Sequence, residues 1–131
     1  MGTDFKGLDR IGQIAVNVHD LARAVTFYRE ALGMPFLFEV PGMAFFDCGG
    51  VRLMLGIPVG TEVDHPASII YYKVDDIEAA YRALLSRGVA FLAKPHVVAR
   101  MPAYVLWLAE FKDPDANVLA LMSEVPVEVP S

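Results

Sequence analysis

The hydrophobic pattern of the chain occurs twice. A β-branched, apolar run begins at Gln13 and ends at Asp20, and a second run begins at Ile69 and ends at Asp76. An amphipathic stretch follows each aspartate, with apolar residues at three- and four-residue spacing. These apolar positions are Leu21, Ala24, Val25, Tyr28 and Leu32 in the first stretch, and Ile77, Ala80, Tyr81, Leu84 and Leu85 in the second. The pattern predicts a strand and then a helix in each half, with one face of each helix packed on a sheet.

Polar and turn-forming residues mark both ends of the two predicted helices. Asp20 and Asp76 precede the helices, where a carboxylate accepts the free N–H groups of the first turn. Gly33 and Gly88 follow them, and glycine commonly ends a helix. We therefore expect Asp20 and Asp76 to be N-caps and the two glycines to be helix stops.

Short apolar runs separated by turn residues follow each predicted helix. They span residues 36–40, 43–47 and 51–57 in the first half, and 89–93, 104–111 and 117–123 in the second. Each half is thus a βαβββ module, which predicts an α+β fold. We expect residues 1–131 to form one domain, with module one at about 9–57, a linker at 58–66, module two at about 67–124 and a tail at 125–131.

Composition and charge narrow the possible functions. Apolar residues make up 55% of the chain and charged residues 21%, so a folded globular domain is expected. The net charge of −5 argues against a nucleic-acid partner, which would need clustered Lys and Arg. Cys48 is the single cysteine, which excludes an internal disulfide and fits a reducing compartment. No stretch has the apolar length of a signal peptide or a membrane span, so we expect a cytoplasmic protein without a membrane partner.

The two strand–Asp–helix openings and the turn Asp113-Pro114-Asp115-Ala116-Asn117 resemble the vicinal oxygen chelate superfamily, which contains glyoxalase, bleomycin-resistance and extradiol-dioxygenase proteins. The resemblance covers roughly residues 9–124. It implies an open, half-barrel-like mixed sheet around a cavity, with helices on the outside. It also implies a homodimer, because relatives pair their modules across a two-fold axis. The family turn usually carries Gly where this chain has Ala116, so we expect strain there if the position needs a positive φ.

Metal-dependent relatives place a His on the first strand and a Glu on the last strand of each module. Carried over to this chain, those positions are Gln13, Met54, Ile69 and Ala120. Gln13 offers one carboxamide oxygen at best, and the other three side chains offer no suitable ligand for Zn²⁺, Fe²⁺ or Mg²⁺. We therefore expect no metal and no other cofactor.

Three histidines remain as candidates for a substitute site. We expect His19 at the exposed end of the first strand and His65 in the solvated linker. His96 is expected in the loop that enters residues 97–99, at the rim of the cavity. Three scattered histidines do not form a metal motif.

Strand alternation predicts which residues share the face of the four carried-over positions. The face comprises Gln13, Ala15, Asn17, Arg52, Met54, Ile69, Tyr71, Lys73, Val118, Ala120 and Met122. It is mostly apolar, so we expect an organic ligand of apolar or aromatic character. The candidate ligand-binding residues are Gln13, Met54, Ile69, Leu108, Ala120 and His96. Gln13 needs a hydrogen-bonding partner there, which is a ligand, water or Glu110.

Glu110 interrupts the apolar lining. The resemblance turns this position towards the cavity, where burial beside Leu108 and Met54 would raise the carboxyl pKa and favour a general base. Tyr71 is a weaker candidate that would bind a ligand or orient Glu110. The alternative is that Glu110 lies at a strand end, solvated or paired with Lys112, Arg52 or Lys73.

Three functions remain open at this point. The first is a metal-free small-molecule-binding protein. The second is a metal-independent enzyme of the lyase, isomerase or epimerase type that uses Glu110 as general acid or base. The third is a metal-dependent lyase or dioxygenase with relocated ligands. The sequence leaves open both the identity of the ligand and whether the protein is an enzyme, because function depends on the site and not on the fold.

Overall fold

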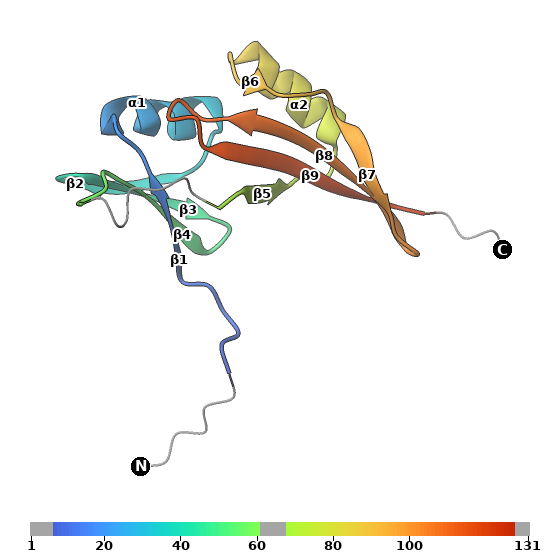
Figure 1. Cartoon of the computed structure of the whole chain (residues 1–131), viewed down its shortest axis with the longest axis horizontal. Coiled ribbons are helices and arrows are strands. Elements are labelled where there is room, and N and C mark those ends of the chain that lie inside the picture. The colour runs from blue at the N-terminus through green and yellow to red at the C-terminus, as the bar shows by residue number, and fades with distance from the viewer. Residues whose placement is uncertain (1–6, 61–67, 128–131) are drawn as a thin grey trace.

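The computed structural model describes residues 7–60 and 68–127, which form a βαβββ module and a second module of the same order with one more strand (Figure 1). The first module contains β1 (Gln13–Asn17), α1 (Leu21–Thr26), the π-helical turn η1 (Phe27–Ala31), β2 (Phe36–Val40), β3 (Met43–Cys48) and β4 (Val51–Gly56). The second contains β5 (Ile70–Lys73), α2 (Ile77–Ser86), β6 (Ala90–Phe91), β7 (His96–Arg100), β8 (Tyr104–Lys112) and β9 (Val118–Pro126). The predicted α+β class and the repeat are confirmed.

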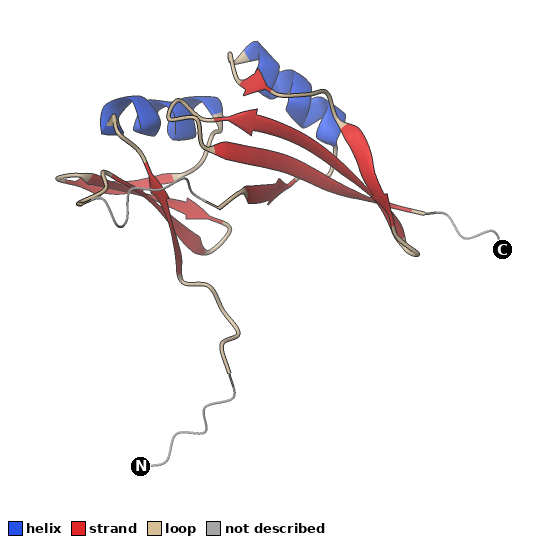
Figure 2. Ribbon diagram, in the orientation of Figure 1, coloured by secondary structure: helices blue, strands red, loops and turns tan. Residues whose placement is uncertain are grey.

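Each module has its own open mixed sheet, and neither sheet closes into a barrel. The first is ordered β1-β4-β3-β2, and the second is ordered β5-β9-β8-β6, with β7 also paired to β8. The first strand of each module runs parallel to the last, whereas the other pairings are antiparallel. Both helices lie on the same side of the sheets (Figure 2), so no helix of the described residues covers the opposite side. We call that opposite side the helix-free face.

The predicted caps are confirmed, and the end of the first helix is corrected. Asp20 accepts a hydrogen bond from the Arg23 N–H at 3.1 Å, and Asp76 accepts one from Ala79 at 3.0 Å. Gly33 and Gly88 adopt φ angles of +70° and +84°, which glycine tolerates without a steric penalty. Residues 27–31, expected to continue the α-helix, form the wider π-helical turn instead.

Three predictions about the strands and loops of the second module are also corrected. The strand expected at 89–93 is reduced to β6, which has two residues. The segment containing His96 is strand β7 and not a loop, because it pairs with the outer edge of β8. Strand β9 extends to Pro126, into the predicted tail, because the first residues of β8 offer it hydrogen-bonding partners. Residues 61–67 and 128–131, which hold the rest of the predicted linker and tail, lie outside the described part of the chain.

The turn between β8 and β9 joins the two modules. Tyr28 of η1 donates a 2.8 Å hydrogen bond to Asp113 Oδ2, and both side chains are buried. Asn117 Nδ2 donates to the backbone oxygen of Asn17 and to Asp113 Oδ2. Asp115 Oδ1 accepts the backbone N–H of His19 at 2.8 Å. These contacts hold the end of β1 and the first-module helix against the second module.

Ala116 lies in the same turn with a φ angle of +65°. The Cβ atom of a residue other than glycine is crowded in this left-handed conformation, which costs about 1–2 kcal/mol. The predicted strain at the position where the family carries Gly is therefore confirmed.

None of the helices in the described residues is long and apolar enough to cross a membrane.

Candidate functional site

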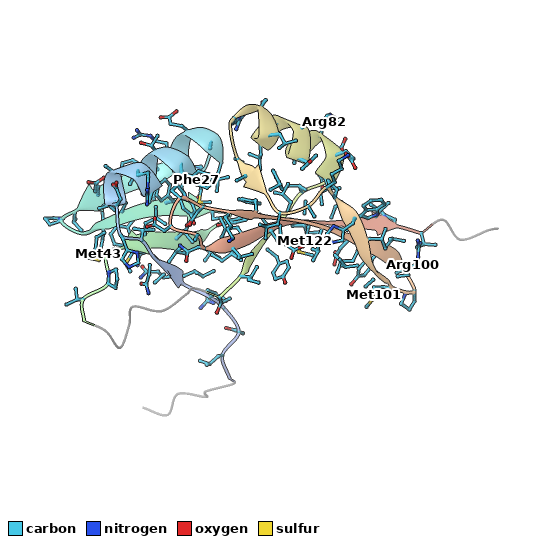
Figure 3. All side chains as sticks on the ribbon, turned by 45° about the horizontal axis from the view of Figure 1, so that its top comes forward. Phe27, Met43, Arg82, Arg100, Met101 and Met122 are labelled. Carbon is cyan, nitrogen blue, oxygen red and sulfur yellow. The ribbon has the colours of Figure 1, made fainter. Side chains whose placement is uncertain are left out.

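The helix-free face carries the residues that strand alternation predicted. In β1, β4 and β9 the neighbours that point the other way, towards the helices, are buried core residues such as Val16, Leu53 and Leu119. Gln13, Met54 and Ala120 therefore belong to the helix-free face. Figure 3 shows Met43 and Met122, one from each module, on the side of the sheets away from α1 and α2.

On the first sheet, Gln13 is bonded to its register neighbour Arg52. The Arg52 Nε–H donates to Gln13 Oε1 at 2.8 Å, while Gln13 Nε2 donates to Met54 Sδ at 3.7 Å. The Arg52 guanidinium also lies over the Phe45 ring, 5.6 Å from its centroid. Phe45 in turn stacks on Phe38, with ring centroids 4.6 Å apart. Arg52, and not Glu110 on the other sheet, is thus the protein group that donates to the Gln13 carboxamide oxygen.

These residues do not fit a divalent cation. The one oxygen that Gln13 offers is already occupied by a guanidinium, whose positive charge repels a second cation. Met54 offers a thioether, and Ile69 and Ala120 offer only hydrocarbon. Within residues 7–60 and 68–127, no group of three or more His, Cys, Asp or Glu side chains is arranged to hold a metal ion.

On the second sheet, Glu110 and Tyr71 are separated by a strand. Glu110 pairs with Ala120, and Ala120 pairs with Tyr71, so the three residues form one row across β8, β9 and β5. Ala120 is fully buried, whereas Tyr71 is 49% exposed. Lys73, considered as a partner for Glu110, instead forms a 2.9 Å ion pair with Glu124. This hydrogen bond raises the pKa of Lys73.

Of the two alternatives left open for Glu110, the structure does not show the buried one. Its side chain is 36% exposed, and its Oε1 lies 3.9 Å from His96 Nε2. Strand β7 pairs with the edge of β8. This pairing places His96 opposite Leu108 and close to Glu110. The His96 side chain is 44% exposed, and its Nδ1 lies 2.8 Å from the Lys94 backbone oxygen. The structure therefore brings together two candidates that sequence reasoning considered separately.

The two sheets meet at a depression of about 480 Å³ between β1 and β5. Residues from both modules line it, including Ala15 on one side and Ile69 and Tyr71 on the other. Ile69 and Tyr71 are both substantially exposed there. Gln13 lies on β1 and Met54 on the neighbouring β4 of the first sheet, while Leu108, Glu110 and Ala120 lie beyond β5 on the second. The predicted site residues thus share one face and are distributed over two sheets.

Burial controls the ionisation of three groups behind this face. Burial, and then the nearby Asp113 carboxylate, raise the pKa of Tyr28 far above its usual value. Burial raises the pKa of Tyr72, whose Oη has no hydrogen-bond partner in the described structure. Burial, followed by the charge of Asp47, raises the pKa of the Cys48 thiol. Cys48 therefore stays protonated at neutral pH and is a poor nucleophile.

Of the other two histidines, the structure describes only His19. The His19 side chain is 60% exposed and lies 3.7 Å from Asp115 Oδ1, at the joint between the modules. This agrees with its expected place at the exposed end of the first strand. His65 lies outside the described residues.

Sequence reasoning missed the connections of Arg52. It assigned Arg52 to the cavity face only as a lining residue and considered it as a partner for Glu110, which lies on the other sheet. The available signal was register: once β1 runs parallel to β4, Gln13 stands opposite Arg52. The Phe38–Phe45 stack was missed because a register shift in the β2–β3 pairing changes which β2 residues lie on the helix-free face.

Comparison with known proteins agrees with this fold. Residues 10–121 match the model of the Glyoxalase/Bleomycin resistance protein/Dioxygenase superfamily. The uncharacterized protein YraH of Bacillus subtilis is 31% identical over 123 residues, covering 83% of this chain and 94% of that protein. The chain belongs to the Glyoxalase/Bleomycin resistance protein/Dioxygenase superfamily.

Solved structures share the fold. A superfamily member from Sphaerobacter thermophilus is 27% identical, with a TM-score of 0.73 and coverage of 89% of this chain and 98% of that one. A glyoxalase/bleomycin resistance protein/dioxygenase from Nocardioides is 22% identical, with a TM-score of 0.73 and coverage of 97% and 91%. A lactoylglutathione lyase from Agrobacterium tumefaciens is 21% identical, with a TM-score of 0.72 and coverage of 90% and 96%. Identity at these last two levels supports the fold and not a shared activity.

Proposed function

We propose that this protein is a metal-independent member of its superfamily that binds a small apolar or aromatic organic molecule on the helix-free face. The observation that carries the proposal is the 2.8 Å bond from Arg52 Nε to Gln13 Oε1. It occupies the one oxygen available among the four carried-over metal positions and adds a positive charge beside it. The remaining lining, including Met54, Phe45 and Phe38, offers apolar and aromatic contact area.

A homodimer in the cytoplasm is part of the proposal. Ile69 and Tyr71 are exposed beside β1 and β5, which are edge strands of their sheets. A second copy placed over this region would cover both the edges and the apolar side chains. Light scattering tests this: a mass of twice 14.4 kDa is expected, and a concentration-independent mass of 14.4 kDa would contradict it.

Ligand binding is tested by titration with neutral aromatic probes. Benzyl alcohol and indole, followed by ¹H–¹⁵N NMR, should shift amide resonances of β1, β3 and β4 and leave those of α2 unchanged. Phe45→Ala, which removes one ring of the exposed stack, should weaken the binding. Phe91→Ala is the matched control, because Phe91 packs on Tyr81 and Phe111 on the helix side. Shifts scattered over all elements, or none, would refute the proposed site.

The His96–Glu110 pair favours proton transfer as a second candidate function. The Lys94 backbone oxygen only accepts hydrogen bonds, so His96 Nδ1 carries the proton in this contact. In the neutral ring Nε2 then has a free lone pair, 3.9 Å from the Glu110 carboxylate. A C–H or O–H acid placed beside Nε2 would lose its proton to His96, and Glu110 would stabilise the resulting imidazolium. In this candidate function His96, and not Glu110, is the general base, and Glu110 is the carboxylate that supports it.

Solvent deuterium exchange tests this second candidate. Phenylpyruvate, whose benzylic C–H is acidic, should exchange faster with the protein than without it. His96→Gln should lower the protein-dependent rate by about 10²–10⁴-fold, the usual effect of losing a general base. Glu124→Gln is the control, because this carboxylate pairs with Lys73 on the same face. If the His96→Gln variant exchanges phenylpyruvate as fast as the wild type, the pair has no part in proton transfer.

A further inference from the structure

Arg52 is an oriented guanidinium that has no ion-pair partner in the part of the chain that the structure describes. Its Nε is held by Gln13 Oε1 at 2.8 Å, and its plane is supported by the Phe45 ring at 5.6 Å. Within the described residues no carboxylate lies within ion-pair distance of it. Asp47, its register neighbour on β3, instead accepts the backbone N–H of Gly50 at 3.1 Å.

The contact with Gln13 determines which N–H donors of Arg52 remain available to a ligand. An arginine side chain has five N–H donors, and Nε uses its single one on Gln13. The four N–H groups of Nη1 and Nη2 make no hydrogen bond within the described residues, and together they match the two oxygens of a carboxylate. Because Arg52 is exposed, a molecule from solvent can reach these groups.

A comparison with Arg29 shows that this arrangement is not general. Arg29 also lies over a phenylalanine ring, at 5.6 Å from the centroid of Phe36. Its Nε, however, donates to the neighbouring Glu30 carboxylate at 3.1 Å. The charge of Arg29 is therefore neutralised by a neighbouring carboxylate, whereas Arg52 is held by a neutral amide and forms no ion pair within the described residues.

Aromatic surface adjoins the guanidinium. Phe45, which lies under Arg52, stacks on Phe38 with the rings 26° apart, and Phe38 is 47% exposed. Met54 stands in register with Phe45, accepts the Gln13 Nε2–H and adds a polarizable thioether. A ring stacked on this surface would place a carboxylate substituent near Arg52.

We infer that the helix-free face selects an aromatic carboxylate, with Arg52 binding the carboxylate and the Phe38–Phe45 stack binding the ring. The inference rests on the proposed binding function and adds to it the charge of the ligand. Gln13 is a positioning residue, because it acts by orienting Arg52.

Benzoate, benzyl alcohol and benzylamine share one ring and differ in charge, so they test the inference when titrated at equal ionic strength. The readout is the Arg52 Nε–H resonance together with the backbone amides of β3 and β4. Benzoate should bind at least about tenfold more tightly than benzyl alcohol, the effect of one charge-assisted contact, and benzylamine should bind most weakly. Arg52→Met should remove the preference for benzoate but leave benzyl alcohol binding in place. Gln13→Ala should reduce the preference, and Arg29→Met, the matched control, should keep it.

The outcomes separate the two claims. If benzyl alcohol and benzoate bind equally at this face, and Arg52→Met changes neither, the binding function stands and the choice of an anion is wrong. If none of the three probes shifts this face, both the proposed binding function and the anionic ligand are wrong. If benzoate retains its preference in Arg52→Met, another group selects the anion and the role of Arg52 is refuted.

Discussion

Tyr28 Oη donates a 2.8 Å hydrogen bond to Asp113 Oδ2, across 85 residues of sequence and from one module to the other. The Asp113 side chain also accepts the N–H groups of Asp115 and Asn117. All the acceptor atoms of this buried carboxylate are therefore in use, as expected for a charge that leaves water.

Removing the Tyr28 hydroxyl should destabilise the protein. In Tyr28→Phe the buried Asp113 carboxylate loses a donor, and we expect the free energy of unfolding to fall by about 2 kcal/mol. Urea denaturation measures it. Tyr72→Phe is the matched control, because the buried Tyr72 Oη has no partner in the described structure and its loss should leave stability unchanged or slightly higher. Equal losses in the two variants would contradict the assignment.

Alkaline pH should destabilise the protein through the same two tyrosines. Burial raises the pKa of both above 10.0, so the folded state keeps protons that the unfolded state loses above pH 10. The unfolded state then binds fewer protons, and each tyrosine lowers stability by up to about 1.4 kcal/mol per pH unit; below pH 10 the effect disappears. Urea unfolding between pH 9.5 and 11.5 should give a shallower decline for Tyr72→Phe than for the wild type. Parallel curves would show that Tyr72 ionises freely in the folded state.

Ala116→Gly should stabilise the protein. Glycine adopts the observed φ of +65° without steric crowding, and this relief exceeds the extra entropy of glycine in the unfolded chain. We expect a gain of about 0.5–1 kcal/mol in urea denaturation. Ala83→Gly provides the contrast. Ala83 lies within helix α2, so this variant should lose about 1 kcal/mol of the free energy of unfolding. A loss at both positions would mean that the turn does not hold Ala116 under strain.

The purified protein should contain no stoichiometric divalent metal, and a chelator should leave its melting temperature unchanged. The physical reason is the donor set of Gln13, Met54, Ile69 and Ala120, together with the Arg52 guanidinium bonded to Gln13. Elemental analysis and thermal unfolding with and without chelator measure this. One tightly held equivalent of Zn, Fe, Mn or Ni would instead favour the relocated-ligand enzyme.

The sequence by itself was enough for the strand–helix repeat, the helix caps and the faces of β1, β4, β5 and β9. These features depend on neighbours only a few residues apart: Asp20 caps a helix three residues on, and side chains alternate along any strand. Even the strain at Ala116 was readable from a single turn. Strand β7 was not predicted from the sequence, because it forms by pairing with the edge of β8, and no local sequence pattern shows that edge.

Only the tertiary structure decided which side chains meet. Arg52 and Gln13 are 39 residues apart, and the bond between them depends on the parallel register of β1 and β4. A shift of one residue would turn Arg52 to the helix side. Glu110 acquired His96 as its neighbour in the same way, through the pairing of β7 with β8. Strand register decides which charged side chains meet across a sheet, and register arises from the packing of whole strands. For that reason the sequence located the residues of the helix-free face but not the contacts between them.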